Sequence, residues 1–221
     1  MDGAPAVVEV VGLAGAGKTT LVEALRQRDA NVVVGAEVAA GRYARYIVRH
    51  LVTFLPTFVR WLPRSRWFNW PETRSMVYLK AWPPALRARP RGITASVLDH
   101  GLIFRLAFLW EFGPELTRSR RFEVWRHSAL VDWAKTLDLV VWLDAPDATL
   151  LTRVKGRPGG HRIIERSTTE ESDVFLARCR RAYERVLREM EPHRRFRVLR
   201  FDTSRMRPEE IAEAVLAEMR R

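Results

Sequence analysis

The stretch Gly12-Leu13-Ala14-Gly15-Ala16-Gly17-Lys18-Thr19 decides the fold of this chain, and it closely follows the apolar run Val7-Val8-Glu9-Val10-Val11. It fits the phosphate-binding pattern G-x-x-x-x-G-K-[ST], in which a strand precedes the loop and a helix follows it. The apolar run predicts a short buried strand, and residues 20–28 predict a helix because their apolar side chains share one side. The sequence therefore predicts a nucleoside triphosphate site directly after the first strand.

Each fixed position of this loop has a chemical task. Glycines let the backbone wrap closely around phosphates and turn its N–H groups inward, and the following helix directs its positive end at the same anion. Lys18 is expected to reach the β- and γ-phosphates, and the hydroxyl of Thr19 to hold Mg²⁺. ATP and Mg²⁺ are thus the expected cofactors. The predicted nucleotide-binding residues are Gly12, Ala14, Gly15, Ala16, Gly17, Lys18, Thr19 and Thr20.

The composition is typical of a soluble globular protein, with 47% hydrophobic and 29% charged residues in a chain of 221. We expect a single α/β domain spanning residues 1–221, which is long enough for a real core. The single cysteine, Cys179, excludes an intrachain disulfide and a thiolate metal cluster. A strand that begins near Val7 leaves no room for a signal peptide, and no segment approaches the roughly eighteen apolar residues of a membrane span. We therefore expect a cytoplasmic protein.

The stretch 38–97 is both basic and aromatic. It holds eleven arginines and lysines against the single acid Glu72, and its prolines at positions 56, 63, 71, 83, 84 and 90 predict a series of short helices. The net charge of the whole chain is +12, which suits phosphate-rich ligands but also nucleic acid or anionic lipid.

Three interpretations of this stretch remain open. In the first, it is an acceptor-binding insertion at about 38–92, in which arginines hold anionic groups and rings stack on a planar or sugar moiety. In the second, it is a helical layer with a solvated basic face. In the third, it is an amphipathic surface that lies on an anionic membrane. Under the first interpretation, Arg42, Arg45 and Tyr46 at the start of its first helix are the candidate acceptor-binding residues.

Acidic residues follow two further predicted strands. Residues 32–34 predict a second strand with Glu37 beyond its carboxyl end, where ligands bind in open α/β sheets. Residues 93–98 predict a third strand that ends at Asp99, the expected position of a second Mg²⁺-organising group. Alternatively, Asp99 caps the helix that begins near residue 101. Asp144, at the end of the predicted strand 139–143, is a weaker candidate for the same metal role.

The remaining chain predicts four helices, a lid and an edge strand. Helix 102–112 is apolar almost all round and is expected to be buried, and in helix 173–190 we interpret Cys179 and Tyr183 as core residues. The alternating residues 196–201 predict the fifth strand, and the other helices span 121–135 and begin at residue 208. Residues 150–166 predict a mobile lid whose Arg153 and Arg157 neutralise charge on the transferred group, or else a solvated basic turn.

Five strands that alternate with helices predict a doubly wound parallel sheet. With its motifs, the chain resembles the thymidylate kinase-like branch of P-loop kinases, which includes nucleoside monophosphate kinases and deoxynucleoside kinases. The resemblance implies a three-layer α/β sandwich with strand order 2-3-1-4-5. It is carried by the loop 12–20, the strand ends Val97-Leu98-Asp99 and Leu143-Asp144-Ala145-Pro146, Arg153 and Arg157, and the strand 198–201 before Pro208.

Two departures from the family concern the acceptor. Thymidylate kinases have an arginine where this chain has His100, and Gly35-Ala36-Glu37-Val38 is closer to the glutamate that deoxynucleoside kinases use as a base, without its proline. Either Glu37 or Asp99 is therefore the candidate base. The catalytic set predicted from the sequence is Lys18, Asp99, Glu37, Arg153 and Arg157.

The favoured function is phosphoryl transfer from ATP to a small-molecule acceptor, a nucleoside or nucleoside monophosphate first among them. The alternatives are a kinase for a sugar, glycan or antibiotic, and a nucleotide-dependent ATPase or switch protein at a membrane or in an assembly. A guanine-reading Asn-Lys-x-Asp motif is absent from the sequence, which argues against a GTPase. No nucleic-acid partner is expected because the basic stretch matches no recognition motif. Contact with anionic membrane and a homodimer are the remaining partner hypotheses.

Overall fold

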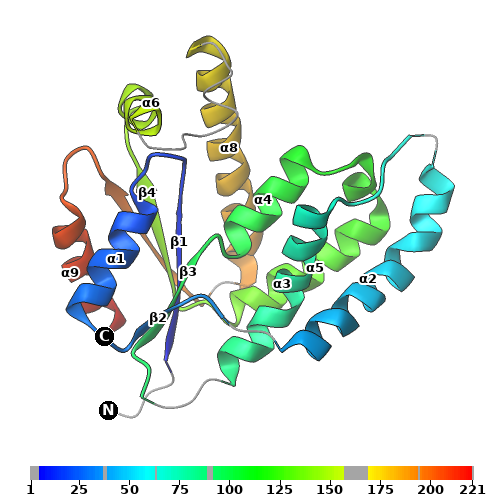
Figure 1. Ribbon diagram of the computed structural model, residues 1–221, viewed down its shortest axis with the longest axis horizontal. Helices are drawn as coiled ribbons and strands as arrows, with labels where there is room; N and C mark the ends of the chain where they lie inside the picture. The colour runs from blue at the N-terminus through cyan, green and yellow to red at the C-terminus, as the bar shows by residue number, and fades with distance from the viewer. Residues whose placement is uncertain are drawn as a thin grey trace.

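The computed structural model of the chain describes residues 5–36, 39–62, 64–88, 92–156, 169–193 and 195–220 (Figure 1). Its centre is a five-stranded sheet in the order β2-β3-β1-β4-β5, and every neighbouring pair of strands is parallel. Both the fold class and the strand order that the resemblance implied are confirmed. The strands are β1 (Ala6–Gly12), β2 (Val32–Val34), β3 (Ala95–Asp99), β4 (Leu139–Asp144) and β5 (Arg197–Asp202).

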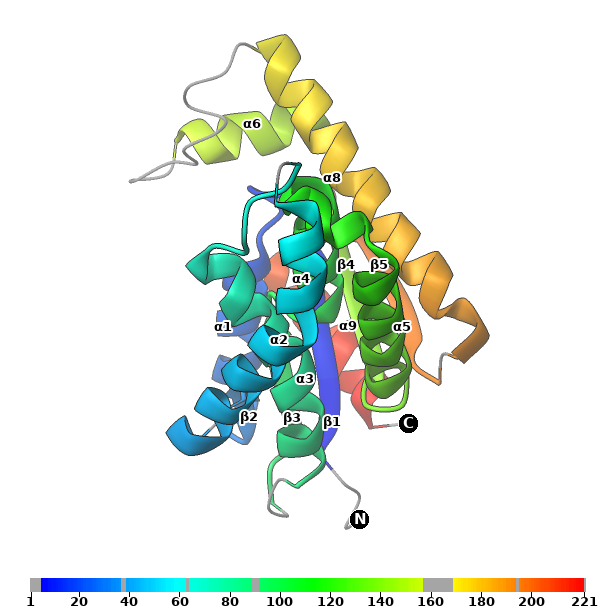
Figure 2. The same cartoon turned by 90° about the vertical axis from the view of Figure 1, so that its right-hand side faces the viewer.

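Helices cover both faces of this sheet (Figures 1 and 2). Two helices pack together on one face, namely α1 (Lys18–Arg28) and α9 (Pro208–Met219). On the other side lie α4 (Leu102–Phe112), α5 (Arg120–Ala134) and α8 (Thr169–Met190). The central strands are buried along nearly their whole length because helices cover them on both sides. The shorter helical segments are α6 (Asp147–Lys155), η1 (Glu115–Arg118) and η2 (Glu191–His193).

The prediction of several short helices between β2 and β3 is wrong, because the chain forms two long ones. α2 (Ala40–Trp61) contains Pro56, and α3 (Trp70–Arg87) contains Pro83 and Pro84. A proline inside a helix leaves the carbonyl four residues earlier without its helical donor. The carbonyl of Leu79, freed in this way by Pro83, accepts a hydrogen bond of 2.7 Å from the indole Nε1 of Trp133 on α5. Tertiary contacts therefore stabilise a helix that local propensity disfavours.

α2 forms an additional outer layer, at the far right of Figure 1. Its inner side is anchored by Phe54, which is fully buried against Phe68, Phe122 and Trp125. One turn earlier, His50 Nε2 accepts a hydrogen bond of 3.2 Å from the Trp125 indole, and burial lowers the pKa of His50 to about 4, so the ring is neutral. Within the described residues, no helix is long and apolar enough to cross a membrane.

Candidate active site

The predicted phosphate-binding loop lies at the carboxyl end of the central strand β1, directly before α1. Gly15 and Gly17 have φ values of 83° and 86°, in the left-handed region that glycine adopts without strain. A Cβ on Gly12 would lie 2.4 Å from the carbonyl oxygen of Leu143 on β4, so no larger residue fits there without moving the backbone. The glycines of the motif are therefore required by backbone conformation at two positions and by close packing at a third.

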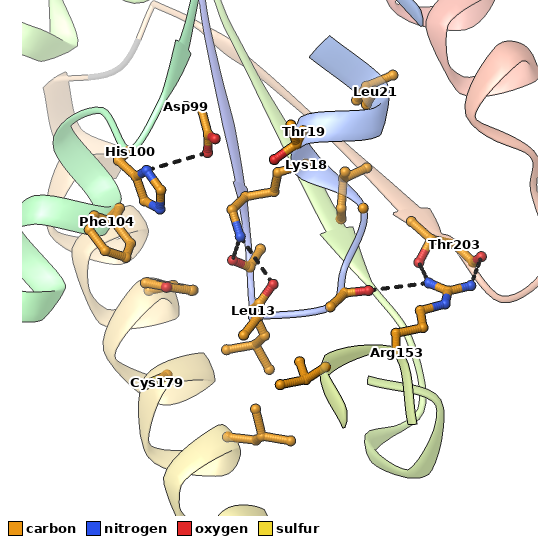
Figure 3. Close-up of a pocket in the computed structure, with 18 of the residues that line it drawn as sticks. Leu13, Lys18, Thr19, Leu21, Asp99, His100, Phe104, Arg153, Cys179 and Thr203 are labelled. Atoms are coloured by element: carbon orange, nitrogen blue, oxygen red, sulfur yellow. Dashed lines mark hydrogen bonds and ion pairs between the residues drawn. The ribbon is translucent and has the colours of Figure 1, made fainter. Parts of the chain in front are cut away.

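Lys18 and Thr19 lie in the first turn of α1, at the mouth of the loop. The ammonium Nζ of Lys18 donates hydrogen bonds to the carbonyls of Gly12 at 2.9 Å and Leu13 at 3.1 Å, which holds its charge over the loop (Figure 3). The side chain of Thr19 is exposed beside it. Because the first N–H groups of a helix lack helical partners and carry its positive dipole, this arrangement favours a bound anion.

Asp99 is the last residue of β3, the strand next to β1 in the sheet. Figure 3 shows its carboxylate beside Lys18 and Thr19. Its Oδ1 is buried and accepts no hydrogen bond from any described residue. Buried carboxylate oxygens are normally satisfied, so an orphaned one marks a place for a ligand. Oxygen donors from Asp99 and Thr19 are the kind that Mg²⁺ prefers, and Mg²⁺ commonly takes its other ligands from phosphates and water. The two predicted metal-binding residues thus fit the ion.

His100 follows Asp99 in an unusual backbone conformation, with a φ of 70° that is rare for residues other than glycine. Its Nδ1 lies 3.6 Å from Asp99 Oδ1, and its ring packs edge-on against Phe104 with centroids 4.1 Å apart. Burial lowers the pKa of His100, so the imidazole is neutral near pH 7. Where the resemblance to thymidylate kinases implies an arginine, this chain therefore presents an uncharged ring.

A cavity of about 890 Å³ connects the loop with a space between α4 and α8. Its polar end contains Lys18, Thr19 and Asp99, together with His100. Its other walls are mostly apolar. α4 contributes Phe104, Phe108 and Phe112, and α8 contributes Phe175, Leu176, Cys179 and Tyr183. Further lining residues come from the end of α6, from α9 and from the segment before α9: Arg153, Val154, Gly156, Thr203, Met206, Pro208 and Ile211. The cavity therefore has a charged compartment and an aromatic compartment in one continuous space.

The aromatic compartment corrects one interpretation of the sequence and extends another. Helix α4 is not buried all round, because only one side of it, with Leu102, Leu106 and Leu109, packs in the core. Tyr183 belongs to the buried core and Cys179 packs against it, as expected, but both also line the cavity. Burial raises the pKa of the Cys179 thiol to about 11, so it stays protonated and is not a nucleophile. Periodicity identifies an apolar face but not whether that face meets a helix or a cavity.

Asp144, the weaker metal candidate, is engaged elsewhere. Arg180 on α8 donates to both of its carboxylate oxygens, from Nε at 2.9 Å and from Nη2 at 3.1 Å, and also contacts Asp147 at 2.7 Å. The hydrogen-bonded carboxylate of Asp144 raises the pKa of Arg180, which keeps the guanidinium charged. Asp144 does not line the cavity, so this aspartate attaches α8 to the sheet edge.

Arg153 on α6 lies on the outer side of the loop, away from Asp99 (Figure 3). Its guanidinium donates to Thr203, to the hydroxyl at 2.9 Å and to the carbonyl at 2.8 Å, and it lies 3.4 Å from the Gly15 carbonyl. It lines the cavity but is not directed at the space between Lys18 and Asp99. Arg157, and with it the predicted lid from residue 157 onwards, lies outside the described residues.

The structure does not bring the predicted acceptor-binding residues to this cavity. Arg42, Arg45 and Tyr46 occupy the first two turns of α2, and no described residue between 39 and 88 lines the cavity. Glu37 lies outside the described residues. Of the predicted catalytic set, the structure therefore brings Lys18 and Asp99 together at one end of the cavity.

Glu9, in the middle of β1, is a structural residue that sequence reasoning missed. Its side chain is fully buried, and Oε1 accepts hydrogen bonds from the backbone N–H groups of Ile103 at 2.8 Å and Phe104 at 3.3 Å. It therefore caps α4, whose own N-cap residue is Gly101, and the alternative role of Asp99 as the helix cap is wrong. The signal was a single carboxylate within an otherwise apolar strand.

Because burial raises the pKa of Glu9 to about 8, this carboxyl group keeps its proton at neutral pH. In the unfolded chain it ionises near its ordinary value of 4.5. The folded state thus binds more protons between these two values, and rising pH favours unfolding across that range. Each unit of pKa difference corresponds to about 1.4 kcal/mol.

We expect Glu9→Gln to remove this contribution to the pH dependence of stability. The free energy of unfolding of the wild type should fall between about pH 4.5 and pH 8, and the fall should be smaller in the variant. Urea unfolding of both proteins at several pH values across the range measures the difference. Parallel stability curves for the two proteins would show that Glu9 is ionised in the folded state.

Comparison with known proteins places the fold. No protein-family model and no curated protein sequence matches the chain. Solved structures match over nearly its whole length at low sequence identity, and two of them serve as examples. The deoxyadenosine kinase from M. mycoides with bound dATP has a TM-score of 0.54 and 14% identity, covering 97% of this chain and 100% of its own. The YorR protein from Bacillus subtilis, in complex with phosphorylated GDP, has a TM-score of 0.52 and 14% identity, covering 96% of this chain and 94% of its own.

These similarities agree with the topology and the loop. The chain has the fold of a P-loop kinase, with the sheet order and phosphate-binding loop described above. Within that class, the fold is similar to that of a deoxyadenosine kinase. At 14% identity the similarity shows the fold alone, so the reaction must be argued from the site.

Proposed function

We propose that this chain is a small-molecule kinase that transfers the γ-phosphoryl group of ATP to a nucleoside or nucleoside monophosphate. The cavity is the observation that carries the proposal, because it joins the phosphate-binding loop and Asp99 to a second, aromatic compartment. An ATPase or switch protein needs room for a nucleotide and water only. A kinase needs a second compartment that holds an acceptor in line with the γ-phosphate.

The charged compartment supplies the groups that phosphoryl transfer requires. Lys18 and the N–H groups of the loop bind the β- and γ-phosphates, while Thr19 and Asp99 hold Mg²⁺. When bound, the ion neutralises charge on the phosphate oxygens. Arg153 contacts the nucleotide from the outer side of the loop in this proposal. To contact the transferred phosphoryl group together with Arg157, the guanidinium of Arg153 must first give up its hydrogen bonds to Thr203.

The aromatic compartment fits a planar ring better than a sugar alone. Phe104, Phe108 and Phe112 form a row along α4, with successive ring centroids 6.2 Å and 5.3 Å apart. Such rings pack against the flat face of a nucleobase and exclude water from it. The acceptor's reactive oxygen then lies toward Asp99. If that oxygen is a hydroxyl, Asp99 or Glu37 accepts its proton, and a phosphate acceptor needs no base.

A phosphoryl-transfer screen with Mg²⁺ and ATP tests this function. The acceptors are nucleosides, nucleoside monophosphates, sugars and aminoglycosides, and Lys18→Ala is the blank. We expect ATP consumption to rise sharply with one nucleoside or nucleotide class and the product to carry the phosphate. Transfer to a sugar or aminoglycoside alone would contradict the proposed acceptor class but would still support a kinase. Slow hydrolysis that no acceptor accelerates would instead favour the ATPase or switch hypothesis.

Phe108→Ala is expected to raise the KM for the acceptor about tenfold and to leave the KM for ATP unchanged. Loss of an aromatic ring that stacks on a base costs about 1–3 kcal/mol, and a tenfold change corresponds to about 1.4 kcal/mol. Steady-state kinetics with each substrate varied in turn give the two constants. Val124→Ala, an exposed site on α5, is the control. A rise in the KM for ATP with an unchanged KM for the acceptor would place the ring of Phe108 against ATP instead.

A further inference from the structure

The outward side of α2 exposes an unusual amount of apolar surface. Six aliphatic side chains on this side expose between 42% and 71% of their area, namely Val48, Leu51, Val52, Leu55, Val59 and Leu62. Their spacing of mostly three and four residues aligns them along one side of the helix, and we call them the apolar stripe. Contiguous exposed apolar surface of this kind marks an interaction site on a soluble protein.

Four exposed arginines border the apolar stripe along one edge: Arg42, Arg45, Arg49 and Arg60. At 100° per residue they lie within about 80° of Val52 around the helix axis. The sequence of α2 contains no acidic residue. None of the ion pairs found among the described residues involves these four arginines. Their charge is therefore available to an anionic partner.

α2 cannot rotate about its axis to bury the apolar stripe against the rest of the described structure. The opposite side of the helix is fixed in the aromatic cluster around Phe54 and in the hydrogen bond between His50 and Trp125. In Figure 2, α2 crosses the front of the molecule with its outer side toward the viewer. The apolar stripe and its arginines thus form an accessible surface on the outermost layer.

Charge decides between a lipid surface and a second copy of this chain. In a two-fold dimer, the same surface of both copies meets, so arginines would face arginines with no carboxylate on either α2 to pair with them. An anionic bilayer provides apolar acyl chains for the stripe and negative headgroups for the arginines, whose long stems also cover apolar surface. We propose that α2 docks the protein on anionic lipid membranes, with its axis parallel to the membrane plane.

Co-sedimentation with vesicles tests this proposal and does not depend on catalysis. The full chain is mixed with phosphatidylcholine vesicles that contain or lack phosphatidylglycerol, at low and at high salt. We expect binding to the anionic vesicles at low salt, at least about tenfold weaker binding to phosphatidylcholine alone, and a loss of affinity as salt screens the arginines. No binding to anionic vesicles at low salt would overturn the proposal.

Two pairs of substitutions separate the apolar and basic contributions. We expect Val52→Asp with Leu55→Asp to lower the vesicle partition coefficient more than about tenfold, because charge then replaces two side chains of the apolar stripe. Arg49→Ala with Arg60→Ala should lower it about fivefold per arginine, and only on anionic vesicles. The matched control is Val124→Asp with Val174→Asp, two valines that are 65% and 60% exposed on α5 and α8, outside the stripe.

The controls also identify the alternative occupant. All variants change exposed side chains, so thermal unfolding should match the wild type, and kinase activity without vesicles should be unchanged. If the aspartate variants instead alter the oligomeric mass in sedimentation velocity and the wild type binds no vesicles, the apolar stripe belongs to a dimer interface. Equal vesicle binding by the stripe variants and the control pair would likewise contradict membrane docking through α2.

Discussion

Lys18→Ala is expected to lower phosphoryl transfer by at least about a thousandfold in a protein that remains folded, a loss typical for the removal of a cation that stabilises transferred charge. The ammonium of Lys18 lies over the loop on the carbonyls of Gly12 and Leu13, next to the helix N-terminus that favours the same anion. Alanine keeps the backbone N–H donors but removes the ammonium charge. Nucleotide binding should therefore weaken less than turnover.

Two controls make the result of Lys18→Ala interpretable. Lys155→Ala removes an exposed ammonium at the end of α6 that does not line the cavity, so its activity should equal that of the wild type. Thermal unfolding and calorimetric titration with ATP then separate loss of fold, loss of binding and loss of chemistry. Substantial turnover by a folded Lys18→Ala protein would contradict the proposed mechanism.

The central strand and its loop are predictable because local sequence and global topology agree there. The loop's fixed positions occur between an apolar run and a helical pattern, and the structure requires glycine at 12, 15 and 17 for reasons of conformation and packing. Asp99 is predictable for a related reason. Parallel strands end at the same edge of a sheet, so an acid that ends a neighbouring strand lies beside the loop.

The two long helices between β2 and β3, and the residues that line the cavity, could not be predicted without the tertiary structure. Pro83 predicts a helix break from local rules, and the bond from Trp133 to the Leu79 carbonyl, 54 residues away in sequence, compensates for it. For the stretch that contains α2, the sequence left three interpretations open, an amphipathic surface among them, and only the structure shows which apolar side chains are exposed. Phe104 and Tyr183 belong to apolar helix patterns, and only the placement of α4 against α8 shows that they border a cavity.

Asp99→Asn is expected to lower turnover at least about a hundredfold, and to raise the Mg²⁺ concentration required for half-maximal rate. Asparagine has nearly the same shape but lacks the negative charge, so it tests charge alone. A carboxylate oxygen that is buried without a hydrogen-bond partner is costly to the folded protein. Since Glu9 already caps α4, the helix gains nothing from Asp99. We therefore expect the unliganded variant to be at least as stable as the wild type.

Asp144→Asn provides the contrast, because both aspartates end parallel strands at the same edge of the sheet. Asp144 binds Arg180 through both oxygens, so its replacement leaves a charged guanidinium poorly paired and should lower the free energy of unfolding by about 1–3 kcal/mol. The dependence of the turnover of Asp144→Asn on Mg²⁺ concentration should equal that of the wild type. Kinetics across Mg²⁺ concentrations and urea unfolding of both variants measure the two effects. If Asp99→Asn destabilised the protein and left the Mg²⁺ dependence unchanged, Asp99 would be structural and the metal would be held elsewhere.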